Sequence, residues 1–353
     1  MNQIPTTLVG RRQFFQLVGA YGCAGVLATT SWADSRSSAW SSQVIRLDAF
    51  SDRHKAPVVT ALALHPERPL LAIAGDDHLV RVWNLSEMRC VHFLEDHTDW
   101  VRALNYSPDG NLLASAGNDH RLILWDSMSG AKIREQLSSG QTLTAICFAC
   151  SSDQIASVGL GNTLQVFDVS EGTLVRELNC PSIDMRALTF SPCGQHIAAG
   201  GRNGRIRVWD SRSGDVVVQY SVHQQRIRGL AFSPDSRWLA SCGEDRKVYV
   251  FSMDTRDSFM LPRRRNKVLS LVFCGNDRLA TGGSDNLVRI WDLAAGIEID
   301  SLSGHSGSVA ALAYNGELLA SAGYDTTVRL WQQPPNIAGE GGGSIRRVGD
   351  TRR

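Results

Sequence analysis

The sequence predicts an all-β repeat protein, and three observations lead to that prediction. A strand-like segment ending in Trp or Phe recurs seven times along the chain. Four successive intervals between these aromatic residues are 42 residues, and the last two are 40. Short runs of alternating apolar and polar residues, separated by Pro, Asp, Asn and Gly, are typical of half-buried strands. The seven aromatic residues are Trp83, Trp125, Phe167, Trp209, Phe251, Trp291 and Trp331.

Each copy contains four predicted strands in the same order. The first, as in VRALNYSPDG from Val101, ends in a turn of Ser, Pro, Asp and Gly. A short strand of small apolar residues follows, as in NLLASAG, and then a tight turn with Asp or Asn. The third strand ends in the aromatic residue, and a fourth follows it, as in CVHFLEDH. Every copy is therefore expected to form its own antiparallel sheet.

This repeat resembles the WD40 repeat, in which each copy is one four-stranded blade of a β-propeller. The resemblance covers about residues 43–333 and implies one seven-bladed WD40 β-propeller domain, with four antiparallel strands per blade. The endings that match are LVRVWN, RLILWD, TLQVFD, RIRVWD, KVYVFS, LVRIWD and TVRLWQ.

The last copy lacks a fourth strand of its own. Pro334 and Pro335 follow its aromatic residue, and the Gly-rich residues 334–353 are expected to be disordered. The segment Val44–Phe50 also has a strand pattern, and it precedes the first strand of the first copy, so it is a fourth strand without a blade of its own. We therefore expect this segment to join the last blade and close the ring, which removes two free sheet edges.

Serine, histidine and aspartate occur together in several copies, which suggests a hydrolase triad. A catalytic set is not expected in repeated near-copies, so we reject that interpretation. The WD40 resemblance implies instead a buried hydrogen-bond network within one blade. Its members are His97, Ser115, Asp119 and Trp125 in blade 2, His223, Ser241 and Asp245 in blade 5, and His305, Ser321, Asp325 and Trp331 in blade 7. Incomplete versions are expected in blade 1 (His54, Asp77, Trp83) and blade 6 (Thr281, Asp285, Trp291).

Composition restricts the function classes. The 353 residues are 43% hydrophobic and carry a formal charge of +1, so neither a nucleic-acid nor a membrane-surface partner is expected. Cys147 and Cys150 form an isolated CxxC without a following histidine, and are expected to be buried or turn residues. No catalytic residue, metal or cofactor is predicted. The alternative is a propeller enzyme, or a metal- or redox-binding periplasmic protein, with a site in the central channel.

Residues 1–33 resemble a bacterial twin-arginine (Tat) export signal. Arg11, Arg12 and Phe14 match that motif, while Gly10, Phe15 and Gln16 depart from it. The 21 residues from 13 to 33 are uncharged and end in the small–X–small sequence Ser-Trp-Ala. We therefore expect export to the periplasm or cell envelope. The alternatives are an uncleaved membrane anchor and a cytoplasmic protein.

The resemblance implies a non-enzymatic protein-interaction scaffold, expected to be a monomeric propeller. In the WD40 layout, residues around the start of each first strand, and the residue before the turn Asp, point to the narrower face, called here the narrow face. A basic arc over blades 4–6 beside a tryptophan favours a partner with an acidic segment, against the alternative of a solvated charged rim. The candidates are Trp100, Arg102, Arg186, Arg202, Arg226, Arg228, Lys267 and Tyr324.

Overall fold

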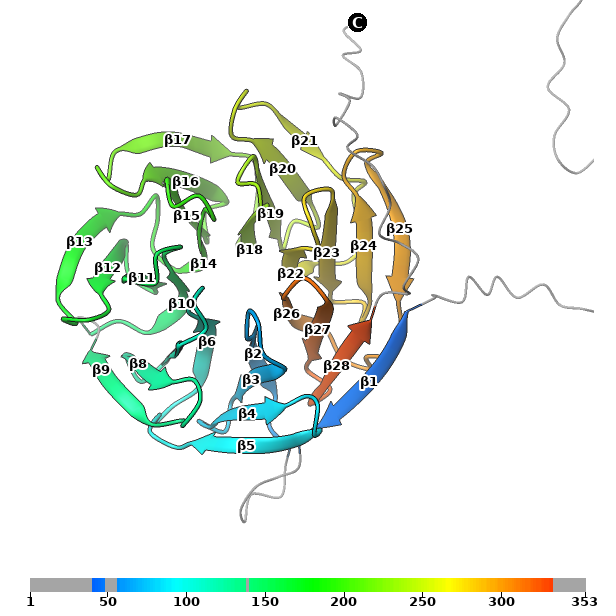
Figure 1. Cartoon of the computed structure of the whole chain (residues 1–353). Coiled ribbons are helices and arrows are strands. Elements are labelled where there is room, and N and C mark those ends of the chain that lie inside the picture. Colours follow the sequence, from blue (N-terminus) through cyan, green and yellow to red (C-terminus); the bar gives the residue numbers. More distant parts are fainter. Residues whose placement is uncertain (1–39, 48–55, 138–139, 333–353) are drawn as a thin grey trace, which may run out of the picture. The chain divides into compact units, whose positions relative to one another are not determined.

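The computed structural model describes residues 40–47, 56–137 and 140–332. Across these ranges the regular elements are twenty-eight β-strands, arranged as seven four-stranded antiparallel sheets. The sheets follow one another around a central axis (Figure 1). The predicted fold class, a seven-bladed propeller, is confirmed. Within the same ranges no helix is long and apolar enough to span a membrane. Residues 1–33 and 334–353, to which we assigned a signal and a tail, lie outside the described residues.

In blades 1 to 6 the strands follow one another outward from the axis in sequence order, whereas in blade 7 the N-terminal strand is the outermost. Blades 1 to 3 comprise β2 (Val59–Leu64), β3 (Leu70–Gly75), β4 (Val80–Asn84) and β5 (Arg89–Leu94); β6 (Val101–Tyr106), β7 (Leu112–Gly117), β8 (Arg121–Asp126) and β9 (Lys132–Leu137); and β10 (Leu143–Phe148), β11 (Gln154–Gly159), β12 (Thr163–Asp168) and β13 (Leu174–Asn179). Blades 4 to 6 comprise β14 (Met185–Phe190), β15 (His196–Gly201), β16 (Arg205–Asp210) and β17 (Val216–Ser221); β18 (Ile227–Phe232), β19 (Trp238–Gly243), β20 (Val248–Ser252) and β21 (Ser258–Met260); and β22 (Val268–Phe273), β23 (Arg278–Gly283), β24 (Val288–Asp292) and β25 (Ile297–Leu302). Blade 7 comprises β26 (Val309–Tyr314), β27 (Leu318–Gly323), β28 (Thr327–Gln332) and β1 (Ser41–Arg46).

The N-terminal strand closes the ring, as predicted. β1 pairs antiparallel with β28, from Ser41 opposite Gln332 to Arg46 opposite Thr327. The predicted range Val44–Phe50 was shifted: the strand begins three residues earlier, and Phe50 lies outside the described residues. Among the six strand residues Ile45 alone is buried, so β1 shows almost no apolar alternation from which its first residue could be predicted.

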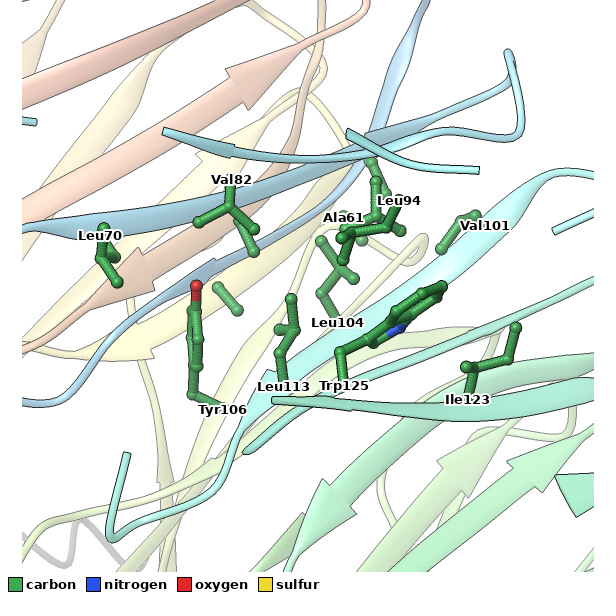
Figure 2. Packing of buried hydrophobic residues seen from close by; sticks show 14 residues of the cluster. Ala61, Leu70, Val82, Leu94, Val101, Leu104, Tyr106, Leu113, Ile123 and Trp125 are labelled. Carbon is green, nitrogen blue, oxygen red and sulfur yellow. The ribbon is translucent and has the colours of Figure 1, made fainter. Parts of the chain in front are cut away.

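The core lies between neighbouring blades, where the face of one sheet packs on the next. Figure 2 shows the contact between blades 1 and 2, in which the Trp125 ring lies among aliphatic side chains such as Val101 and Leu113. Alanines on the second strands, such as Ala72 and Ala74, are buried in the same cluster and allow the sheets to approach closely. Each fully buried aliphatic side chain contributes about 1.5–3 kcal/mol, so the repeated contacts stabilise the whole ring.

Candidate protein-binding face

The first strands surround a central channel with a volume of about 190 Å³. Small residues such as Ala61, Ala103 and Gly229 are among the lining residues, which come from β2, β6, β10, β18, β22 and β26. Arg102 and Arg228 also border the channel, while its lining includes no His, Cys, Asp or Glu. The described ranges also contain no group of three or more such residues that could hold a metal ion. What the channel offers chemically is guanidinium groups, which bind carboxylates and other anions.

The blade 2 network links three parts of the blade through hydrogen bonds. His97, in the loop before β6, has Nδ1 2.7 Å from Asp119 Oδ2 and Nε2 2.7 Å from Ser115 Oγ. Trp125 Nε1 donates to the same Ser115 Oγ over 2.8 Å. Because a carboxylate only accepts hydrogen bonds, Nδ1 carries the proton that joins His97 to Asp119. Ser115 is 0% exposed, so no substrate can reach its hydroxyl.

Blades 5 and 7 contain the same arrangement. His223 Nε2 lies 2.8 Å from Ser241 Oγ, and His305 Nε2 lies 2.7 Å from Ser321 Oγ. The Nδ1 atoms of the two rings face Asp245 at 2.9 Å and Asp325 at 3.0 Å. Trp331 Nε1 donates to Ser321 Oγ in blade 7, whereas Phe251 in blade 5 has no such donor. Three buried copies satisfy their polar groups internally, which is the behaviour of structural networks.

Electrostatics keeps these aspartates ionised. Burial by itself would raise the pKa of Asp119, but the hydrogen bond and charge of His97 and the amides of Thr98 and Arg121 outweigh it and lower that pKa. In blade 7, burial lowers the pKa of His305, which favours the neutral ring. The lowered pKa keeps the Asp119 carboxylate charged, so it acts only as a hydrogen-bond acceptor.

Arginine pairs with the turn aspartate in two blades whose networks we expected to be incomplete. Arg81 lies 2.5 Å from Asp77 in blade 1, and Arg289 lies 2.5 Å from Asp285 in blade 6. Sequence reasoning missed this pairing, although an Arg two residues before the strand-ending Trp was the available signal. Trp291 Nε1 still donates to Thr281 Oγ1 over 2.9 Å in blade 6. His54 lies outside the described residues.

On the narrow face, Trp100 and Arg102 form one unit with Asn118. Trp100 is 41% exposed, and the Arg102 guanidinium lies 4.7 Å from the centroid of the Trp100 ring, a cation–π contact. Arg102 Nε donates to Asn118 Oδ1 over 2.9 Å. Burial lowers the pKa of Arg102, and the positive charges of Arg186 and Arg228 lower it further. A negative group from a partner would relieve this repulsion.

The basic arc of blades 4–6 is a network of ion pairs rather than an unpaired basic patch, which modifies our interpretation. Asp184 pairs with Arg186 at 2.6 Å and with Arg226 at 2.7 Å. Glu244 is 3.0 Å from Lys267 and also near two arginines: Arg226 at 3.5 Å and Arg228 at 3.9 Å. Four cations and two carboxylates leave a formal charge of +2. A partner carboxylate must therefore compete with Asp184 and Glu244. Arg202 is exposed on the turn beside them.

A family model described as "WD domain, G-beta repeat" matches the chain in six ranges. They are residues 47–84, 88–126, 172–210, 214–252, 260–292 and 296–332. The chain belongs to the WD40-repeat family.

Several curated proteins are similar to this WD40 chain over short segments. It is 45% identical to mitochondrial division protein 1 of Schizosaccharomyces pombe over 53 residues, which are 15% of this chain and 8% of that protein. The identity to a periodic tryptophan protein 2 homolog of Neurospora crassa is 36% over 77 residues, 21% and 9% of the two chains. A protein transport protein of Chaetomium globosum is 42% identical over 71 residues, 17% and 24% of the two chains. The matched part is thus less than a quarter of each relative.

Apolar residues that sequence reasoning missed complete the narrow face of this WD40 propeller. Ile183 is 57% exposed, and Leu160 is exposed on the neighbouring turn. The Leu160 carbonyl accepts a hydrogen bond from the Asp184 amide over 3.1 Å, which places the two turns side by side. Tyr324 is exposed at the corresponding turn of blade 7. Leu160 occupies the blade 3 position that corresponds to Asn118 in blade 2, and this alignment was the signal that could have identified it.

Proposed function

We propose that this WD40 protein is a non-enzymatic scaffold whose narrow face binds a partner segment with both acidic and apolar side chains. The observation that carries the proposal is the gathering on that face of exposed apolar residues and arginines. Trp and Arg are favoured hot-spot residues, and large exposed apolar side chains mark binding sites when they cluster. We expect acidic side chains in the partner because burial and the nearby charges of Arg186 and Arg228 destabilise the positive charge of Arg102, which a carboxylate would stabilise.

The partner's apolar residues are expected to lie over blades 2 to 4. Trp100 supplies a flat aromatic surface, and Leu160 with Ile183 supplies an aliphatic one. The acidic residues are expected to face Arg102 and Arg228 at the channel mouth, where the other lining residues are uncharged. Association should therefore weaken as salt is raised, but not vanish, because apolar contacts are insensitive to screening.

Replacing Trp100 or Ile183 by Ala should weaken capture of the partner at least about tenfold, which corresponds to about 1.4 kcal/mol. The partner is first captured from native extract with the wild-type protein, and its dissociation constant is then measured for each variant. Ile133→Ala is the matched control, because Ile133 is 53% exposed but lies on β9 at the outer rim. Unchanged affinity in the Trp100→Ala/Ile183→Ala double variant would place the interface elsewhere.

We also propose export by a Tat-type pathway, on the strength of Arg11 and Arg12 in the sequence. Replacing both by Lys should leave the uncleaved precursor in the cytoplasm, while Arg36→Lys, a control that lies after the predicted signal of residues 1–33, should change nothing. Cell fractionation and N-terminal sequencing make the comparison. A wild-type protein found in the cytoplasm with residues 1–33 intact would refute the proposal.

A further inference from the structure

The turns between first and second strands lie on the face opposite the proposed binding face, and consecutive turns touch. In blades 2 and 3, the Asp109 amide donates to Ser152 Oγ of the next turn over 3.3 Å. In blades 4 and 5, the Cys193 amide donates in the same way to Ser236 Oγ over 2.9 Å. In both contacts the acceptor is a serine at the same position of the repeat, Ser152 in blade 3 and Ser236 in blade 5, and it joins its blade to the preceding one.

Between blades 3 and 4 that position is Gly194, which has no side chain to accept the hydrogen bond. The Cys150 thiol of the blade 3 turn occupies the space instead: a Cβ on Gly194 would lie 2.5 Å from Cys150 Sγ. Gly194 directly follows Cys193. Cys150 of blade 3 and Cys193 of blade 4, both exposed, therefore lie on the two sides of one turn-to-turn contact.

The position of Cys193 is built to hold a negative charge. Its counterpart in blade 2 is Asp109, whose carboxylate accepts hydrogen bonds from the Ser107 hydroxyl over 2.5 Å and from the Asn111 amide over 3.2 Å. In blade 4 the corresponding hydroxyl, Ser191 Oγ, lies 3.4 Å from Cys193 Sγ. The serine position that stabilises a carboxylate in blade 2 thus lies beside a sulfur in blade 4.

These donors change the acidity of the thiol. Burial would raise the pKa of Cys193, but hydrogen bonds from the hydroxyls of Ser191 and Ser236 and from the Gln195 amide lower it. In contrast, burial raises the pKa of Cys147 to about 11. A thiolate is the nucleophilic form of cysteine, so the lowered pKa and the exposure of Cys193 both favour its reaction.

We propose that Cys193 and Cys150 form a redox-active pair, in which a peroxide oxidises Cys193 and Cys150 then closes a disulfide between blades 3 and 4. The Cys193 thiolate attacks one peroxide oxygen, the O–O bond breaks and hydroxide leaves, which gives a sulfenic acid. The Cys150 sulfur then attacks the Cys193 sulfur, and the sulfenic oxygen departs as water with the thiol proton. Two thiols lose two electrons, and the peroxide is reduced to two waters. This inference does not rest on the proposed protein-binding function.

The test oxidises the reduced full-length protein with hydrogen peroxide, blocks the remaining thiols, and identifies tryptic peptides without reduction by mass spectrometry. We expect a peptide pair that links Cys150 to Cys193. Because Cys147 lies on the same tryptic peptide as Cys150, the Cys147→Ala variant assigns the link and should retain it. Cys150→Ser should abolish the link and leave a sulfenic acid on Cys193 that dimedone traps, whereas Cys193→Ser should show neither product.

The relative reactivity of the two cysteines can also be measured in the wild-type protein, without any substitution. Iodoacetamide at pH 7 should modify Cys193 several-fold faster than Cys150. Absence of the disulfide after peroxide treatment, or its persistence in Cys150→Ser, would overturn the proposal. Equal alkylation of the two cysteines would equally contradict the assigned order of attack.

Discussion

Replacing Ile45 by Asp should lower the free energy of unfolding by at least about 3 kcal/mol. Ile45 is 2% exposed and packs with Leu62 and Leu330 in the cluster that joins blades 7 and 1. The substitution removes an aliphatic side chain worth about 1.5–3 kcal/mol and buries a polar group among apolar ones, which costs several kcal/mol more when it is charged. It also weakens β1, the strand that completes blade 7. Urea denaturation followed by tryptophan fluorescence measures the effect.

Val44→Asp is the matched control in the same strand. Val44 is 38% exposed and pairs with Arg329 of β28, so its carboxylate would remain in water near a cation. The expected change is within about 1 kcal/mol. Equal destabilisation by the two substitutions would show that the Ile45 side chain is not buried between blades 7 and 1.

Replacing His97 by Ala should lower the free energy of unfolding by about 1–3 kcal/mol. The change leaves Ser115 Oγ and Asp119 without their shared partner, and the Asp119 side chain is almost completely buried. Unsatisfied buried polar groups carry a cost of this size, and a charged one lies toward its upper end. Chemical denaturation at neutral pH is the measurement, and partner capture should be unaffected in the folded fraction.

The neighbouring Asp96→Ala variant separates the network from a general effect of changing this loop. Asp96 pairs with Lys132 on the surface, where both side chains are well exposed. Such pairs contribute about 0–1 kcal/mol, so this variant should be nearly as stable as the wild type. The triad interpretation would return if Ser115→Ala abolished a specific hydrolysis while leaving the unfolding transition unchanged.

The fold was predictable because each blade repeats a local pattern. The alternation of apolar and polar residues sets which strand faces are buried, and the turn residues set where the strands end. The seven copies, spaced by 42 or 40 residues, set the number of blades. The same alignment placed His97, Ser115 and Asp119 together, since their positions recur in blades 5 and 7. The first residue of β1 was not predictable in this way, because its residues are mostly exposed and carry no alternation.

The sequence by itself determined the seven blades, the N-terminal closure and the members of the hydrogen-bond networks in blades 2, 5 and 7, because these features follow from positions within a repeat. Tertiary structure decided which charges and thiols meet across blades. Arg226 reaches Asp184, 42 positions earlier, and Cys150 reaches Gly194, 44 positions later, because adjacent blades present corresponding turns side by side. Periodicity states that these positions are equivalent, but side-chain reach and the spacing of the sheets decide which of them touch. The ion-paired arc and the approach of Cys150 to the Cys193–Gly194 turn are therefore properties of the closed ring rather than of any single repeat.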